Sequence, residues 1–491
     1  MMSGKENHAY ARYDSTTTYP RSTLQADIVH IGFGAFHRGH QAVYNCLTNQ
    51  LSDNAWGIFE INLFGTPELM NALNNQQGLF TVLESSHSKQ TSRLIRTVIG
   101  GLHTPECGIS AAIDKLLEPQ VKIVSLTITE KGYCIDPQTR MLDLNNPLIA
   151  HDLAHSQQPS SAIALIVRAL QLRKALHLAP FSVLSCDNIP DNGRLTHNAV
   201  VGFAAQIDVE LGQWIEENVT FPGTMVDRIV PAMTEAQFAL LQEKTGYADP
   251  CGIVCEDFRQ WVIEDNFVQG RPEWDKAGAM FVADVLPYEE MKLRMLNGSH
   301  SFLAYNGSLA GYEFIYQCME DPQFREITRQ LMINEQGKTL NPELTINIVE
   351  YSESLLERFA NRNVQHRTAQ IAMDGSQKLP QRVVTSWRKL HEGNNSNKIL
   401  SLLIAGWLHY IIHNLAAGQE ISDPLLPLFK TAVSCSQHSW QKALQLLSID
   451  SIFGELCNET YFIDEINEAF VRIENTGISE TIKHAVSGEY L

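Results

Sequence analysis

Two kinds of hydrophobic pattern follow one another along this chain. Up to about residue 285, short apolar runs alternate with stretches whose apolar residues recur every three or four positions, as strands and helices do in turn. We predict strands at 27–31, 56–63, 79–83, 94–99, 121–128 and 181–186, and helices at 35–49 and 162–176. Strands that alternate with helices predict a mostly parallel sheet.

Beyond residue 285 the strand signals fade and helical periodicity dominates. We predict helices at 311–319, 324–332, 352–359, 399–414 and 424–433. The chain is therefore expected to have a flexible N-terminal tail over 1–26, an α/β domain over 27–285 and a mainly α-helical domain over 286–491. Clefts between domains are favoured ligand sites, so we expect the functional site there, with segment 261–271 as a candidate to close over it.

The first predicted strand runs directly into a glycine turn and a helix. Gly32 and Gly34 permit a tight turn and let backbone N–H groups approach a pyrophosphate at the helix N-terminus. The GxGxxG pattern is incomplete, because His37 stands where the third glycine is expected. The segment still predicts a Rossmann-type dinucleotide site, formed by Ile31, Gly32, Phe33, Gly34, Ala35 and Phe36.

Polar residues near the carboxyl ends of later strands extend this site. An acidic residue near the end of the second strand often binds the adenosine ribose, and Glu60 is the candidate, with Asn62 as the competing position. A solvent-facing strand-end carboxylate is the alternative for Glu60. Ligands of parallel sheets lie beyond the carboxyl ends of the strands, which also selects Thr129, Glu130, Lys131, Asp187 and Asn188.

Segment 287–305 is a predicted helix with an unusual polar face. Pro287 and two following glutamates are typical of a helix start. At 3.6 residues per turn, Lys292, Asn297 and His300 fall within one arc of about 140°, and Lys292 and His300 lie about 12 Å apart along the axis, which suits a six-carbon ligand. Gly298 indicates that a cofactor or substrate approaches the backbone there. In the alternative, the three polar side chains are a solvent-reaching lysine, a loop-bonding asparagine and a core histidine.

Composition limits the possible partners and compartment. The 491 residues carry a formal charge of −18, which argues against general affinity for nucleic acid or anionic membranes. The N-terminus has no apolar signal-peptide core, and no later apolar run reaches about 18 residues, so we expect a cytoplasmic protein. Nine cysteines without further clustered ligands near Cys251 and Cys255 predict reduced thiols and no metal site.

Seven blocks of this sequence resemble one family. They are IVHIGFGAFHRGHQ, SLTITEKGYC, SCDNIPDNG, FPGTMVDRIVP, RQWVIEDNFVQGRPEWDKAGAMFVADV, KLRMLNGSHS and IAMDGSQKLPQR. Together they resemble the polyol-specific long-chain dehydrogenases, the mannitol dehydrogenase family, from about residue 27 to 382 and more loosely beyond. Within the family, the chain looks most like the members that interconvert D-fructuronate and D-mannonate.

The resemblance implies a Rossmann-type domain followed by a helical domain, NAD as cofactor and hydride transfer without a metal. It implies that Lys292 is the general acid and base, and that Asn188 and Asn297 donate hydrogen bonds to the reacting oxygen. It further implies that His300 orients the substrate and that Glu130 takes part in proton exchange between Lys292 and water. Oxidation requires a neutral amine, so we expect the pocket to lower the pKa of Lys292 below the ordinary value of about 10.4.

A uronate substrate carries a carboxylate that needs a cation. Arg367, Lys378 and Arg382 are the candidates, because guanidinium grips carboxylate with two hydrogen bonds and ammonium pairs as a point charge. A surface charge or an ion pair within the chain is the alternative for each of them.

Other hypotheses stay open at this point. A mannitol or arabinitol 2-dehydrogenase or a tagaturonate reductase would share these residues, and a dinucleotide-binding sensor would lack turnover. We expect a small sugar acid as the partner and a monomer or weak homo-oligomer. A carboxylate at Glu60 would repel a 2′-phosphate and so favour NAD over NADP.

Overall fold

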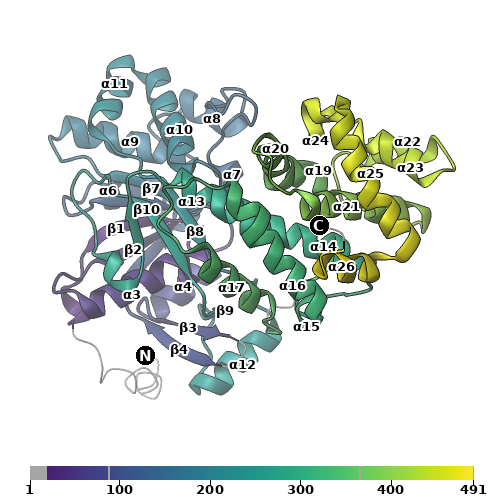
Figure 1. Ribbon diagram of the computed structural model, residues 1–491. Helices are drawn as coiled ribbons and strands as arrows, with labels where there is room; N and C mark the ends of the chain where they lie inside the picture. Colours follow the sequence, from purple (N-terminus) through teal and green to yellow (C-terminus); the bar gives the residue numbers. More distant parts are fainter. Residues whose placement is uncertain (1–18, 87–88, 364–365, 490–491) are drawn as a thin grey trace. The chain divides into compact units, whose positions relative to one another are not determined.

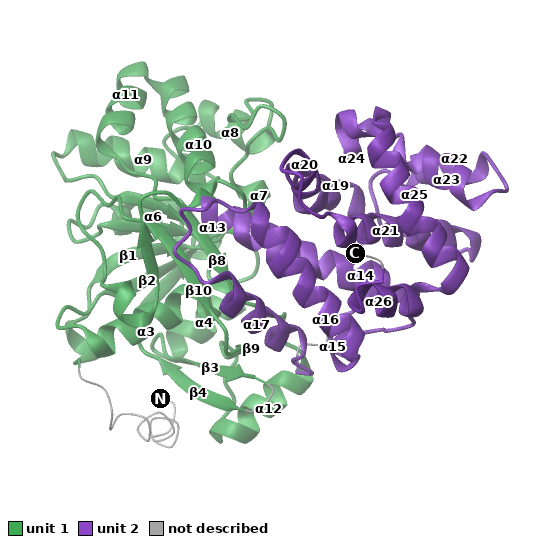
Figure 2. Cartoon of the chain, viewed as in Figure 1, with its two compact units in different colours: residues 1–286 green, residues 287–491 purple. Residues whose placement is uncertain are grey.

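The computed structural model describes residues 19–86, 89–363 and 366–489. The chain divides into two compact units, Met1–Leu286 and Pro287–Leu491 (Figure 2). The division lies within two residues of the domain boundary predicted at 285.

Unit 1 is built on a five-stranded parallel sheet, which confirms the predicted α/β class (Figure 1). Its strand order is β5-β2-β1-β6-β7. The strands are β1 (Ala26–Ile31), β2 (Gly57–Asn62), β5 (Val98–His103), β6 (Ile123–Leu126) and β7 (Ser182–Ser185). The order reverses between β1 and β6, and a sheet of this kind binds ligands at that point, beyond its carboxyl ends.

Helices cover both faces of this sheet, as the burial of its strands on two sides requires. One face packs Val29, Val124 and Val183 against α6 (Ile109–Leu116), α9 (Ala162–Ala175) and α10 (Asn192–Ile207). The other packs Ile28 and Ile58 against α3 (Gln41–Leu51). The further helices include α4 (Glu68–Asn75), α8 (Pro147–Ala154), α11 (Val209–Asn218) and α12 (Glu235–Thr245).

Several predicted elements of unit 1 differ in detail. The helix predicted at 35–49 is two helices, α2 (Ala35–Gly39) and α3, because the backbone of His40 leaves helical geometry at φ −124° and ψ −87°. The strand predicted at 94–99 is wrong, because β4 (Gln90–Ile95) ends there and β5 begins at Val98.

Two three-stranded sheets flank the main one. The first contains β3 (Phe80–Ser85), β4 and β9 (Ile253–Glu256), and the second β8 (Thr224–Asp227), β10 (Gln260–Glu264) and β11 (Met280–Val282). Trp261 in β10 is fully buried, so this part of segment 261–271 belongs to the core and is not a lid.

The described end of the predicted N-terminal tail, residues 19–26, is fixed to the domain. Residues 1–18 lie outside the described part of the chain. Tyr19 is buried, and the Arg21 guanidinium donates to the carbonyls of Arg96 and Val98 at 3.1 and 2.7 Å. Tyr19 and Arg21 therefore pack against the rest of unit 1.

Unit 2 is helical, as predicted. Its helices include α14 (Ser299–Leu309), α15 (Ile315–Glu320), α16 (Pro322–Gln330), α17 (Ile348–Phe359), α20 (Thr385–Glu392), α21 (Lys398–Ala416), α22 (Leu426–Ser434), α23 (Ser439–Leu447), α25 (Thr460–Thr476) and α26 (Ile478–Val486). Helix α21 is the centre of the core, and α14 and α25 pack on it. It is also the one helix among the described residues that is long and apolar enough to cross a membrane, although 72% of its apolar window is buried.

Candidate active site

The glycine turn between β1 and α2 is tied to both neighbouring strands. Gly32 has φ +108°, and a Cβ there would lie 2.1 Å from the carbonyl oxygen of Thr127, so only glycine fits. Its N–H donates to the carbonyl of Ile61 in β2 at 2.9 Å. The Thr127 hydroxyl, just after β6, donates to the Gly32 carbonyl at 2.7 Å. The turn is thus held in place before any ligand arrives.

A cavity of about 190 Å³ opens beside this turn, at the carboxyl ends of β1, β2 and β6. Its walls come from Ile31, Gly32, Asn62, Leu63, Phe64, Thr127, Ile128, Gly132, Leu148, Ser161 and Ala162, and they include no charged side chain. Asn62 also braces the turn, because its Oδ1 accepts the N–H of Phe33 at 2.8 Å. A larger groove of about 770 Å³ lies at the opposite, amino ends of the strands, where parallel sheets do not bind their ligands.

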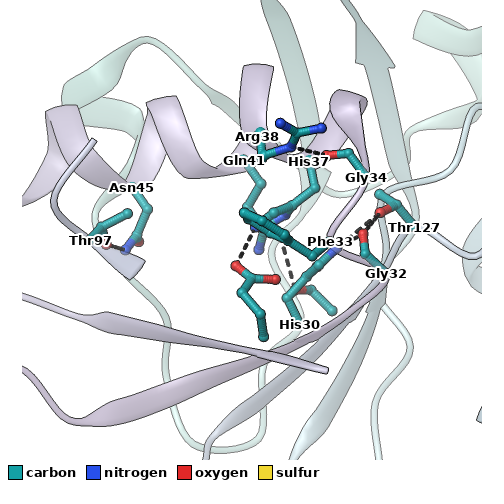
Figure 3. A network of polar contacts seen from close by, with 12 residues as sticks. His30, Gly32, Phe33, Gly34, His37, Arg38, Gln41, Asn45, Thr97 and Thr127 are labelled. Atoms are coloured by element: carbon teal, nitrogen blue, oxygen red, sulfur yellow. Dashed lines mark hydrogen bonds and ion pairs between the residues drawn. The ribbon is translucent and has the colours of Figure 1, made fainter. Parts of the chain in front are cut away.

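Glu60 does not face this cavity. It is fully buried, and its Oε1 lies 2.8 Å from Nε2 of His37. Figure 3 labels His37 beside His30 and the glycine turn. Burial raises the pKa of Glu60 to about 8 and lowers the pKa of His37 and of His30 to about 3. The expected contact between Glu60 and a ribose is therefore contradicted, because His37, in the place of the third glycine, covers the carboxyl group.

The same three residues do not form a metal site. Ligand atoms of His30, His37 and Glu60 lie within 4.8 Å of one another, but the two rings stack at 3.5 Å with planes only 16° apart. Imidazole lone pairs lie in the ring planes, so stacked rings cannot direct both at one ion. His30 instead bonds Ser125 Oγ and Thr127 Oγ1 at 2.8 and 2.9 Å.

The remaining predicted residues of unit 1 sit at or beside the glycine turn or at the ends of β6 and β7. Phe33 turns its ring into the core against Phe80, so only its backbone is available to a ligand. Gly34 is exposed, and Ala35 and Phe36 are half-buried at the start of α2, where first-turn N–H groups lack helical acceptors. Thr129, Glu130 and Asn188 are exposed.

The polar helix of unit 2 contains a π-helical segment, which sequence analysis did not predict. It consists of α13 (Leu286–Met291), the π-helix η4 (Lys292–Gly298) and α14. In a π-helix the N–H of residue i+5 bonds the carbonyl of residue i, so Lys292 and Asn297 come onto one side of the helix. An α-helix would have separated them by about 140°. Lys292 is 7% exposed and Asn297 is half-buried.

His300 lies among rings and cations of the same unit. Its ring is 4.4 Å from Phe359 and 5.9 Å from His366. Burial, with His366 nearby and the positive charges of Arg358 and Arg382, holds the pKa of His300 well below its ordinary value. The imidazole is neutral at pH 7 and can donate with one nitrogen and accept with the other.

Of the three candidate cations, only Arg382 lies beside these residues. Its Nη1 is 3.3 Å from both the Asn297 carbonyl and Ser301 Oγ. Lys378 donates to the carbonyls of Ile371 and Met373, and Arg367 is exposed and pairs with Glu313 at 3.6 Å. Among the three candidates, Arg382 is thus the one with hydrogen bonds to Asn297 and Ser301.

Comparison with known proteins fits both units. The Rossmann-domain model of the mannitol dehydrogenases matches residues 26–276, and the model of their C-terminal domain matches 284–474. The chain belongs to the mannitol dehydrogenase family. The family predicted from the sequence blocks is therefore confirmed.

Relatives within the family differ in what they are named for. The chain is 47% identical to the uncharacterized oxidoreductase YdfI of Escherichia coli over 94% of this chain and 96% of that one. It is 44% identical to the D-mannonate oxidoreductase of the same organism, over 95% and 96%. The mannitol 2-dehydrogenase of Pseudomonas fluorescens, solved with NAD and D-mannitol, is 36% identical with a TM-score of 0.76 over 96% of each chain.

Two residues of this family member were missed by sequence reasoning. Arg358 is buried in the last turn of α17, and His366 stands next to the candidate cation Arg367. Both place positive or polar groups near His300. No local signal distinguishes them, because their burial depends on segments distant in the sequence.

The group that approaches Gly298 was also predicted wrongly, as a cofactor or substrate. A Cβ at this position would lie 2.5 Å from Gln336 Nε2 and 3.1 Å from the carbonyl oxygen of Arg382. The close approach comes from the chain itself and not from a ligand.

Proposed function

We propose that this protein is an NAD-dependent oxidoreductase that interconverts D-fructuronate and D-mannonate without a metal. The observation that supports this choice of substrate is the position of Arg382. Its guanidinium is held against the helical turn that bears Asn297 and Ser301. Such a group pairs with a carboxylate through two hydrogen bonds, which a neutral polyol has no use for. The 44% identity to a D-mannonate oxidoreductase supports the same substrate.

NAD is proposed to occupy the cavity beside the glycine turn. The uncharged, partly apolar walls suit an adenosine, and Asn62 stands at the end of β2 where the ribose is expected. The turn at Gly32 lets the backbone approach the pyrophosphate. NAD is also the cofactor in the solved complex of the related mannitol 2-dehydrogenase.

The chemistry follows from the polar side chains of the site. NADH, when bound, supplies the hydride for the ketone carbonyl. We assign Asn188 and Asn297 as donors to the oxygen on which negative charge grows, and losing one such donor typically costs about 3–4 kcal/mol of barrier. Lys292 delivers the proton in reduction and accepts it in oxidation, and Glu130 exchanges that proton with water. Neutral His300 orients the substrate hydroxyls.

A substrate panel tests the proposal. Reduction rates for fructuronate, tagaturonate and fructose are measured with NADH and with NADPH. We expect Arg382→Gln to lower kcat/KM for fructuronate about 100-fold, as the loss of a two-bond ion pair implies, and to lower the value for fructose far less. Arg367→Gln is the matched control and should change neither rate by more than about twofold, because its charge is exposed.

The panel also separates the alternatives. Faster reduction of fructose than of either uronate would make the protein a polyol dehydrogenase of the same family. Absence of turnover with every sugar, together with tight NADH binding, would leave the sensor hypothesis standing.

A further inference from the structure

We propose that Asp187, held by Tyr133, is a positioning residue that locks the turn bearing Thr129 and Glu130 onto the end of β7, beside Asn188. The inference rests on the proposed function, because it concerns how two of its polar groups are presented. Neither Asp187 nor Tyr133 has to touch the substrate for this role.

The Asp187 carboxylate joins the ends of two neighbouring strands. It follows β7, yet its Oδ2 accepts the N–H of Ile128 at 2.9 Å and its Oδ1 accepts the N–H of Thr129 at 3.1 Å, both just after β6. The Tyr133 hydroxyl donates to the same Oδ2 at 2.7 Å. Three donors on one carboxylate fix its position and, through it, the position of the turn.

Tyr133 holds the Asp187 carboxylate in place from within the core. It is fully buried, and its hydroxyl also lies 2.6 Å from Ser185 Oγ in β7. The backbone of Asp187 is held from the other side, because Asn192 Nδ2 donates to its carbonyl at 3.0 Å and to the carbonyl of Thr224 at 2.9 Å. The carboxylate therefore has no freedom to follow a moving turn.

The turn needs such a restraint. Thr129 has φ +61°, a left-handed conformation that a β-branched residue rarely adopts and that is strained for it. Thr129 and Glu130 are exposed, so core packing does not hold them there. The N–H of Thr129 in this conformation points to Asp187, and without the carboxylate the turn can relax and carry Glu130 away.

The test is a double-mutant cycle on the full chain, with Tyr133→Phe and Glu130→Gln, measured on the panel substrate that the wild type reduces fastest. We expect Tyr133→Phe to lower kcat about tenfold, while the dissociation constant of NADH, measured by fluorescence, stays within about twofold. In the double variant, kcat should equal that of Glu130→Gln alone, because Tyr133 acts through Glu130. Both single variants should show the same increase in the solvent deuterium isotope effect on kcat.

Tyr247→Phe is the matched control, because it removes a hydroxyl bonded to Thr81 at 2.6 Å in a different sheet, and kcat should not change. Asp187→Asn should act like Tyr133→Phe but more strongly, since an amide cannot accept both N–H groups. Additive effects of Tyr133→Phe and Glu130→Gln, or an unchanged isotope effect, would overturn the proposal. That outcome is distinct from failure of the proposed function, which appears as a wild type that does not reduce fructuronate.

Discussion

Glu60 and Asn62 lie two residues apart in β2, and only the second reaches the cavity. Sequence spacing could place a polar side chain at the end of this strand, but it could not choose between the two. The choice is made by His37, whose ring covers Glu60 where a glycine would have left it open. A one-residue departure from the glycine pattern thus moves the predicted ribose contact from a carboxylate to an amide.

The buried Glu60 carboxyl predicts a specific pH dependence of stability. Its folded-state pKa, about 8, exceeds its ordinary value of 4.5, so the folded protein holds the proton more tightly than the unfolded chain does. The contribution of Glu60 to the free energy of unfolding should therefore fall as pH rises from about 4.5 through about 8. Between pH 6.5 and 8 the loss is roughly 1.6 kcal/mol, because about 1.36 kcal/mol is lost per pH unit while the folded-state carboxyl is protonated and it is half ionised at pH 8.

Urea unfolding of wild type and Glu60→Gln across this range tests the linkage. Glu335 in unit 2 also has a pKa raised to about 8, so the quantity to compare is the difference between variant and wild type at each pH. A constant difference would mean that Glu60 does not titrate there. The lowered pKa values of His30 and His37 act oppositely, so the contribution of these two histidines to stability should rise as pH rises from about 3 to about 6.5.

Replacement of Lys292 tests its proposed role as the general acid and base. Lys292→Ala should reduce turnover by at least about 100-fold, the lower range for general acid and base catalysis, while NADH binding stays nearly unchanged. Steady-state kinetics and a fluorescence titration measure the two quantities. Lys389→Ala, at an exposed lysine of the same unit, is the control. Normal turnover in the first variant would refute the role of Lys292.

The helix from Leu286 to Leu309 shows what periodicity can and cannot predict. Pro287 and the glutamates after it predicted where the helix starts, and its polar residues predicted that it contributes to a ligand site. The π-helix inside it was not predictable, because one extra residue per turn leaves no signature in a pattern of apolar positions. It depends on what packs around it, including Gln336 and the backbone of Arg382 at Gly298.

Gly298→Ala tests this packing. The added methyl group meets a buried amide and a backbone carbonyl, so we expect a loss of about 1–3 kcal/mol in the free energy of unfolding. Activity should fall as well, since the displaced carbonyl belongs to Arg382. Gly311→Ala is unsuitable as a control because Gly311 has φ +86°; Ser308→Ala, in the same helix, serves instead. An unchanged urea midpoint for Gly298→Ala would contradict the close contact.

For the molecule as a whole, sequence pattern predicted the class of each unit well. Parallel strands and amphipathic helices can be predicted from the local pattern of apolar positions. The burial of Glu60 and Arg358 depends instead on residues distant in the sequence. Each large hydrophobic core among the described residues also lies within one unit. The two units should therefore unfold as separate cooperative steps.

NADH should stabilise unit 1 against unfolding and leave the unfolding of unit 2 unchanged. At 100 times its dissociation constant it should add about 2.7 kcal/mol to the unfolding of unit 1. Hydrogen exchange in moderate urea, followed by mass spectrometry, can compare peptides from β1 and β2 with peptides from α21. Equal protection in both sets would contradict separate unfolding.

Helix α21 has a consequence for the life of the chain before it is folded. Ribosomes deliver residues 398–416 well before α25 and α26, yet α25 is one of the helices that shield it in the finished core. During that interval residues 398–416 are an exposed apolar segment, which can bind lipid or the same segment of another incomplete chain. Slower elongation past residue 416, or release of a chain cut short there, should thus produce aggregates rather than a shorter soluble product.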